Sequence, residues 1–388
     1  MPANRRRAHV ARCSQPRHIE LIYDSGSGGL LFAPYLYGER TPYADGSVRG
    51  NEGTMETMKN DAKTSHRLFG SYKGREVYLF SIENENGYRV ELLSYGAGLC
   101  GLYFPSDPAR NCVLSFDNFA DYETNDYYLG STVGPTAGRI KNAQYEIDGV
   151  AYSLDKNEGG NNLHGGRRAF HNIVWEASVA ARGVKFTSSE IEIMTAEVIY
   201  NLNPDNSLEI IFRACSLNPV LFNPACHAYF NLGGRDIKNH YLQINARKYL
   251  ELDAQNIPTG KKLPVKDTVY DFTGSSQIGP HLKGSGIDTP FCLKYPVACT
   301  LENEDRTRKI SVITDRNALV VYTAGYFEPV WTINGRTAAP FMGVALEAQT
   351  LPDAVNHPGW GDTVIKDNCI KEYKTVLKLE DKAGSRER

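Results

Sequence analysis

Short stretches in which apolar and polar side chains alternate dominate the chain from about His66 to its end. Glu76–Ile82 alternates in this way, Asn86-Gly87 then predicts a tight turn, and Arg89–Leu93 resumes the alternation. By the same criteria we expect further strands at Tyr145–Ile147, Ala151–Leu154, Ser207–Ala214, Tyr241–Leu252, Ala318–Tyr322, Gly343–Gln349 and Lys374–Leu379. Because no long segment has helical periodicity with caps, the pattern predicts an all-β sandwich.

Residues 1–57 differ from this pattern. Five arginines occur before the first acidic residue, Glu20, and no lysine occurs before Lys59. Three interpretations remain open: a disordered extension, an Arg-rich transit peptide, or a mis-assigned start with the protein beginning at Met55 or Met58. On each of them we expect residues 1–57 to lie outside the fold. The strand-rich remainder has no linker, so residues 58–388 are expected to form one domain.

Composition narrows the classes of partner. The 388 residues carry a formal net charge of −2, which favours neither nucleic acid nor an acidic solvating tail. We find no run of about 18 apolar residues, so no membrane-spanning helix is expected. Eight cysteines are scattered without a CxxC pair, which is typical of a reduced, cytoplasmic protein.

Two strand-like stretches carry polar side chains on one face only. If Asn223–Leu232 is extended, His227, Tyr229 and Asn231 share one face, and the intervening residues are apolar. In Gly343–Gln349 the same alternation places Glu347 within an otherwise apolar strand. A buried carboxylate has a raised pKa, as a general base near neutral pH requires. The alternative is an ordinary half-exposed strand.

Three further residues are presented by turns or loops. His164 lies in the Gly-rich stretch Asn161–Gly166, where a backbone can approach a ligand closely, and Arg139 and Asp288 are flanked by turn-forming residues. We find no metal-binding or nucleotide-binding motif in a suitable context, so we expect neither a metal nor a cofactor. Histidines, carboxylates, an arginine and aromatic residues together indicate a neutral polyol ligand and proton-transfer chemistry.

Several stretches carry a resemblance to a known family. They are Leu163-His164-Gly165-Gly166, His227-Ala228-Tyr229-Phe230-Asn231-Leu232, Gly286-Ile287-Asp288, Leu346-Glu347-x-Gln349 and Pro352-Asp353-Ala354-x-Asn356. From about His66 to the C-terminus the chain resembles the aldose 1-epimerases, or galactose mutarotases. The resemblance implies a large antiparallel β-sandwich, the galactose mutarotase-like supersandwich. It also implies an isomerase that interconverts the α and β anomers of a free aldose without cofactor or metal.

The resemblance assigns roles to individual residues. It implies that Glu347 is the general base, that His227 is the general acid and that His164 assists at the sugar. It further implies that Arg139 and Asp288 bind the sugar hydroxyls. For such a pair activity should be bell-shaped in pH, with the acidic limb set by Glu347 and the alkaline limb by His227.

The aromatic Tyr229 matches a residue that often lines the family's sugar pocket. Three departures leave the preferred sugar open among glucose, galactose and a disaccharide such as maltose. Gly138 stands where many members have asparagine, Thr289 stands where many have histidine, and Val320 lies near the place where some have glutamine. One alternative is a hexose-6-phosphate 1-epimerase, for which Arg167 and Arg168 could add positive charge near Arg139. Another is a sugar-binding module without activity. The expected partner is a small sugar, with no nucleic acid or membrane, and the protein is expected to be a monomer or homodimer.

Overall fold

The computed structural model describes residues 62–382, apart from positions 125, 189, 192, 193, 295 and 367, together with the backbone of two short strands nearer the start. The chain divides into two compact units, residues 1–59 and 60–388. In the first unit, β1 (Leu21–Tyr23) pairs antiparallel with β2 (Leu30–Phe32). The rest of residues 1–57 lies outside the described part, so the expectation about this segment remains a prediction.

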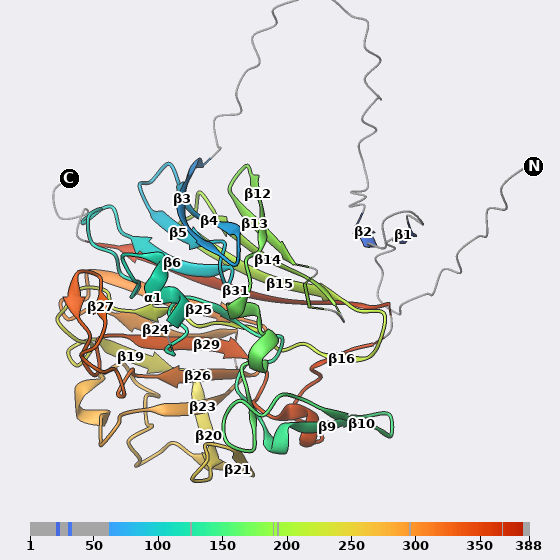
Figure 1. Ribbon diagram of the computed structural model, residues 1–388. Helices are drawn as coiled ribbons and strands as arrows, with labels where there is room; N and C mark the ends of the chain where they lie inside the picture. Colours follow the sequence, from blue (N-terminus) through green and yellow to red (C-terminus); the bar gives the residue numbers. More distant parts are fainter. Residues whose placement is uncertain are drawn as a thin grey trace, which may run out of the picture. The chain divides into compact units, whose positions relative to one another are not determined.

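Antiparallel sheets make up most of the second unit (Figure 1). The largest has the strand order β12 (Glu176–Ala180), β13 (Gly183–Ser188), β14 (Thr195–Leu202), β15 (Ser207–Cys215), β31 (Ile370–Asp381), β25 (Arg308–Thr314), β24 (Val297–Glu302), β19 (Tyr241–Ile244) and β22 (Ser276–Gln277). A six-stranded sheet has the order β18 (Tyr229–Phe230), β29 (Val344–Gln349), β26 (Ala318–Tyr322), β23 (Asp288–Leu293), β20 (Ala246–Leu252) and β21 (Pro258–Pro264).

Smaller elements complete this unit. A four-stranded sheet is formed by β3 (Lys63–Tyr72), β4 (Arg75–Glu83), β5 (Arg89–Leu93) and β6 (Gly98–Tyr103). Short pairs are β7 (Thr132–Val133) with β17 (Ala225–Cys226), β8 (Arg139–Ile140) with β11 (Asn162–Leu163), β9 (Gln144–Ile147) with β10 (Val150–Ser153), β16 (Val220–Leu221) with β30 (Val364–Ile365), and β27 (Thr332–Ile333) with β28 (Arg336–Thr337). The helix α1 (Phe119–Thr124) is a short one. Among the described residues, no helix has the length and apolar character needed to cross a membrane.

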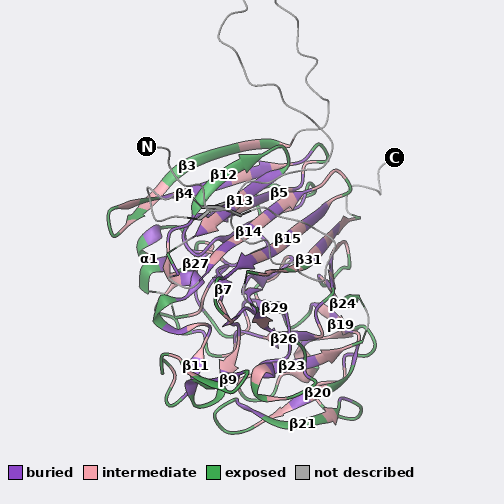
Figure 2. Ribbon diagram, turned by 90° about the vertical axis from the view of Figure 1, so that its right-hand side faces the viewer, coloured by how far each residue is buried: buried purple, intermediate pink, exposed green. Residues whose placement is uncertain are grey.

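The core lies between the sheets. Alternate residues of a strand face opposite sides, so Val344 and Leu346 of β29 enter the same buried cluster as Ile210 and Phe212 of β15. The edge strands β3 and β12 are largely exposed, whereas β26 and β29 are almost wholly buried (Figure 2). The face of β29 that points away from this cluster is therefore also enclosed, and it carries Glu347.

The structure confirms the expected all-β, antiparallel sandwich. Arg89–Leu93 and Ala318–Tyr322 are strands with the expected bounds, and β29 begins one residue later than expected. The expectation of one strand over Tyr241–Leu252 is wrong, because Asn245 separates β19 from β20, which belong to different sheets. The side chain of Asn245 donates a hydrogen bond to the carbonyl of Val297, which holds the chain where it changes sheet.

Asn223–Leu232 is also not one continuous strand. It contains β17 and β18, and His227 and Ala228 lie between these two short strands. The interruption arises because β17 pairs with β7 whereas β18 pairs with β29, so the two halves follow different partners. His227 thus lies where the chain passes from one pairing to the next.

Candidate active site

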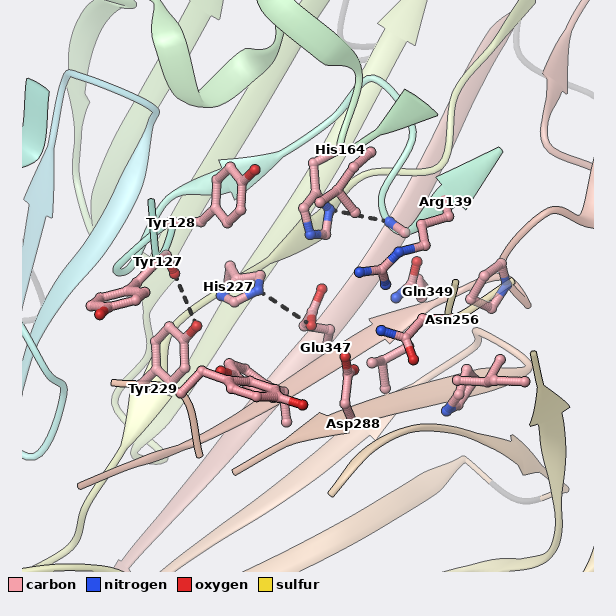
Figure 3. Close-up of a pocket in the computed structure, with 18 of the residues that line it drawn as sticks. Tyr127, Tyr128, Arg139, His164, His227, Tyr229, Asn256, Asp288, Glu347 and Gln349 are labelled. Carbon is pink, nitrogen blue, oxygen red and sulfur yellow. Dashed lines mark hydrogen bonds and ion pairs between the residues drawn. The ribbon is translucent and has the colours of Figure 1, made fainter. Parts of the chain in front are cut away.

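A cavity of about 210 Å³ opens beside β29, and it brings together the six residues singled out in the sequence (Figure 3). These lining residues are Arg139, His164, His227, Tyr229, Asp288 and Glu347. They come from β8, the loop after β11, the segment between β17 and β18, β18 itself, β23 and β29. The fold therefore assembles one polar cavity from segments far apart in the chain.

Glu347 lies on the cavity face of β29, opposite the core residue Leu346. Its residue is 3% exposed, and β29 is buried along its whole length, so the alternative of a half-exposed strand is wrong. Burial raises the pKa of Glu347 to about 8; the nearby charge of Asp288 adds to this effect and Arg139 opposes it. This shift favours the protonated form of the carboxyl group near neutral pH.

The imidazole of His227 faces that carboxyl group. Its Nε2 lies 3.5 Å from Glu347 Oε1, and its backbone N–H donates a hydrogen bond of 2.9 Å to the carbonyl of Ser131. Burial lowers the pKa of His227 to about 4. Between about pH 4 and pH 8 the pair therefore shares one exchangeable proton, which lies mainly on Glu347. Transfer of this proton to His227 produces a carboxylate base beside an imidazolium acid.

The tautomer of His164 follows from its hydrogen bond. The backbone N–H of Gly138 donates to His164 Nδ1 over 3.2 Å, so the neutral ring carries its proton on Nε2. Burial lowers the pKa of His164 well below its usual value, and the neighbouring His227 adds to this. His164 is thus a neutral hydrogen-bond donor. Its positive φ of 52° places it on a sharp turn of the loop before Gly165.

Arg139 is held by the carboxylate of Glu158, which no motif in the sequence had indicated. Glu158 accepts two hydrogen bonds from its guanidinium, 2.6 Å from Nε and 2.7 Å from Nη2. Burial disfavours the charged guanidinium, but the bond to Glu158 and the charge of Asp288 outweigh it and raise the pKa of Arg139. Burial also disfavours the charged form of Asp288 and so raises its pKa, while the positive charge of Arg139 opposes that shift. Arg139 and Asp288 form a polar wall suited to binding hydroxyl groups.

Aromatic side chains close another side of the cavity. Tyr229 packs against His227 with ring centroids 5.0 Å apart, and its hydroxyl donates a hydrogen bond to the carbonyl of Tyr127. Tyr128, which sequence analysis missed, lies edge-on to His164 and His171 at 4.8 and 4.7 Å. Its φ of 54° is unusual for a bulky residue, and no local sequence signal indicates it.

Not every polar residue of the predicted motif reaches the cavity. Asn231 donates a hydrogen bond to the carbonyl of Met342 and accepts one from the backbone of Gly233, so it stabilises a turn. Gln349, by contrast, lies on the same face as Glu347 and lines the cavity. The alternation in β29 already placed it there, although sequence analysis assigned it no role.

Carboxyl groups outnumber arginine and lysine side chains in the cavity lining. Among its described lining residues, Arg139 is the sole arginine or lysine, against Asp126, Asp288 and Glu347. Arg167 and Arg168 are exposed in the loop after His164 and do not line it. Within the described part of the chain, no three His, Cys, Asp or Glu side chains are grouped as metal ligands. The arrangement is equipped to move protons and to bind hydroxyl groups.

The sequence and fold match proteins of one family. The profile of the aldose 1-epimerase family matches residues 78–378. The chain is 34% identical over 337 residues to an aldose 1-epimerase of Streptococcus thermophilus, with 80% of this chain and 97% of that protein covered. It is 32% identical over 331 residues to a maltose epimerase of Levilactobacillus brevis, with 78% and 95% covered.

A solved structure of galactose 1-epimerase from Lactobacillus acidophilus superposes with a TM-score of 0.74 at 26% identity. That match covers 82% of this chain and 99% of the other. The family profile, over residues 78–378, covers well over half of the chain and includes all six of the predicted site residues. The chain therefore belongs to the aldose 1-epimerase family.

Proposed function

We propose that this cavity interconverts the α and β anomers of a free aldose, with Glu347 and His227 as its acid–base pair. The family to which the chain belongs consists of isomerases that act on aldoses. The observation that carries the assignment is the buried contact of 3.5 Å between His227 Nε2 and Glu347 Oε1. Two proton-transferring groups on one cavity wall are what the opening of a cyclic hemiacetal requires.

Ring opening uses the ionic form of the pair. The Glu347 carboxylate takes the proton from the C1 hydroxyl while the His227 imidazolium gives its proton to the ring oxygen. The C1–O5 bond breaks with its electron pair going to the ring oxygen, and a carbonyl forms at C1. The site then holds an open-chain aldehyde, a protonated Glu347 and a neutral His227.

Ring closure reverses these transfers after rotation about the C1–C2 bond. His227 takes the proton back from the C5 hydroxyl, whose oxygen attacks the other face of C1. Glu347 returns its proton to the former carbonyl oxygen, which regenerates both groups. His164, with its proton on Nε2, is placed to donate a hydrogen bond to a sugar oxygen, and Arg139 and Asp288 hold further hydroxyls.

The cavity's charge favours a neutral sugar over a sugar phosphate. A phosphate dianion would meet the carboxyl groups of Asp126, Asp288 and Glu347. Arg139, the sole arginine or lysine among the described lining residues, is already bound to Glu158. Among neutral sugars, glucose, galactose and maltose are the candidates. The similarity to a maltose epimerase keeps the disaccharide among them. The apolar side chains of Leu252, Pro290 and Val320 supply walls against which a sugar ring can pack.

Polarimetry tests the proposal directly. Freshly dissolved α-glucose, α-galactose and maltose are followed with the protein and with a buffer blank, and α-glucose 6-phosphate is run as a fourth substrate. We expect acceleration of at least one neutral sugar and a much smaller effect on the phosphate. Binding without any rate above the blank would favour a sugar-binding module, and preference for the phosphate would favour the hexose-phosphate alternative.

Two further properties belong to this proposal. Among the described residues, six cysteines carry free thiols, which supports a reducing compartment and hence the cytoplasm: Cys100, Cys112, Cys215, Cys226, Cys292 and Cys299. A complete set of acid, base and hydroxyl-binding groups lies within one chain, so a monomer suffices for activity and a homodimer remains compatible with it. Size-exclusion chromatography with light scattering distinguishes these two states.

A further inference from the structure

Among the described residues, the side-chain carboxamide of the glutamine at the end of β29 has no hydrogen-bond partner. Gln349 is fully buried, and within the described chain neither its Oε1 nor its Nε2 makes a hydrogen bond. Buried side-chain amides are normally hydrogen-bonded, because folding removes the water that would otherwise satisfy them. An unpartnered buried carboxamide therefore raises the question of which group in the cavity can bind it.

The position of Gln349 supplies that explanation. It lines the same cavity as Glu347 and lies two residues further along the strand on the same face. Two residues of an extended strand span about 6.6 Å, so the carboxamide lies well away from the carboxylate that acts at C1. In the view of Figure 3, Gln349 lies beneath Arg139, and His227 lies on the other side of Glu347.

The space beside the carboxamide is kept open by Gly138. A Cβ atom built on Gly138 would lie 3.6 Å from Gln349 Oε1 and only 3.1 Å from the Cβ of Pro352. The φ of Gly138 is +75°, a conformation that other residues adopt reluctantly. A larger side chain at this position would therefore crowd the approach to Gln349, whereas glycine leaves it free.

We propose that Gln349 binds a hydroxyl group of the sugar other than the reacting one at C1, and so contributes to substrate selection. This inference rests on the proposed function of the cavity. A carboxamide both donates and accepts hydrogen bonds, as a sugar hydroxyl does, so one contact can satisfy both groups. It carries no charge, which suits a neutral hydroxyl in a cavity that already contains three carboxyl groups.

The test removes hydroxyl groups from the sugar and the carboxamide from the protein in turn. kcat/KM is measured for the sugar that the parent prefers and for its 2-, 3-, 4- and 6-deoxy analogues, with the parent and with Gln349→Met. Each analogue has its own intrinsic rate of ring opening. That rate cancels when the same set of sugars is compared between two proteins.

We expect the parent to lose about tenfold or more in kcat/KM when one particular hydroxyl is removed. In Gln349→Met the penalty for removing that same hydroxyl should disappear, while the other penalties stay unchanged. Gln144→Met is the matched control: Gln144 is an exposed glutamine of β9, and all its ratios should equal those of the parent. Gln349→Asn, which keeps the amide but shortens its reach, serves if Gln349→Met does not fold.

Identical losses of kcat/KM in the parent and in a folded Gln349 variant would overturn the inference. They would show that the carboxamide binds only an ordered water or stabilises β29. Failure of the proposed function looks different, because the parent itself would then show no rate above the blank. In that event the same sugars are titrated calorimetrically, and the penalties are taken from Kd. Loss of one specific penalty would still support a Gln349–hydroxyl contact, and unchanged penalties would refute it.

Discussion

β29 and β31 both lie inside large sheets and both carry glutamates, yet the two strands place them in opposite surroundings. On β31, burial alternates along the strand, and Glu372 is 40% exposed and bonded to Arg213 over 2.7 Å. On β29 every residue is buried, and Glu347 faces His227 in a cavity. Only one face of β31 is covered, whereas both faces of β29 are.

This difference explains why one glutamate is suited to chemistry and the other is not. An exposed ion pair such as Arg213–Glu372 is worth roughly 0–1 kcal/mol, because water screens it and two long side chains must be ordered. For Glu347, loss of water disfavours the charged form and raises the pKa to about 8, into the range where a carboxyl group exchanges protons near neutral pH. Enclosure by the fold, more than residue type, creates the acid–base group.

The largest expected effect comes from neutralising Glu347, and the same change at Glu372 is its control. Glu347→Gln should lower kcat by about 10²-fold or more, because a carboxamide cannot accept the C1 proton. Glu372→Gln, the matched change on β31, should leave kcat unchanged and shift stability by about 1 kcal/mol at most. Mutarotation rates by polarimetry and thermal unfolding by circular dichroism measure both.

The partner histidine extends this test. His227→Asn removes the acid from the same pair and should also cost about 10²-fold or more in kcat in a folded protein. Equal activity of Glu347→Gln, His227→Asn and the parent would show that the buried pair does not carry the reaction.

The pH dependence tells whether burial controls the pair. With pKa values of about 4 for His227 and about 8 for Glu347, kcat/KM should form a bell with these limits. Below about pH 4 both groups are protonated and no base remains; above about pH 8 both are deprotonated and no acid remains. This order reverses the expectation from the sequence, in which Glu347 sets the acidic limb and His227 the alkaline limb.

The alkaline limb is the decisive part of that profile. Unperturbed groups would place the two limits at about 4.3 and about 6.5. An alkaline limb near pH 6.5 would therefore contradict the effect of burial on Glu347. The measurement is kcat/KM for one sugar from pH 3 to 10, with stability checked at each end.

A smaller effect is expected where a carboxyl group binds the sugar without exchanging protons with it. Asp288 lines the cavity beside Arg139, and Asp288→Asn should raise KM more than it lowers kcat. Hydroxyl contacts of this kind are made in both the ground state and the transition state. A collapse of kcat at unchanged KM would instead identify Asp288 as the base. Initial rates over a range of sugar concentrations separate the two outcomes.

A weaker effect should follow from releasing Arg139. Glu158→Gln replaces the bidentate ion pair by a neutral contact, so Arg139 should be held less firmly, and KM should rise a few-fold with little change in kcat. The control is Glu380→Gln on β31, which breaks the half-buried pair with Lys309, remote from the cavity lining, and should leave KM unchanged. An unchanged KM in Glu158→Gln would mean that Arg139 needs no such support.

No effect is expected from removing residues 1–57. A chain beginning at Met58 should keep the thermal midpoint and kcat of the full-length protein, because the cavity and the core are built from the second unit. Loss of either property would show that the removed segment contributes to folding or to the site. Thermal unfolding and polarimetry on the two chains make the comparison.

The alternation of side chains was enough to predict several of the strands and the polar face of β29. Arg89–Leu93 and Ala318–Tyr322 are recognisable because the period of two is a local property of an extended backbone. The family's motifs likewise pointed to the six residues that the fold gathers in one cavity. The prediction of one strand over Tyr241–Leu252 was wrong, because the sheet that a strand joins depends on partners distant in the sequence.

Only the tertiary structure decided the chemical state of these residues. Arg139 contacts Glu158, and Tyr128 contacts two histidines. These contacts join separate segments of the chain, and the alternation of side chains within one strand does not predict them. The raised pKa of Glu347 and the lowered pKa of His227 have one main cause, the loss of water around both groups. That loss depends on everything packed around a side chain, so a strand's own sequence cannot specify it.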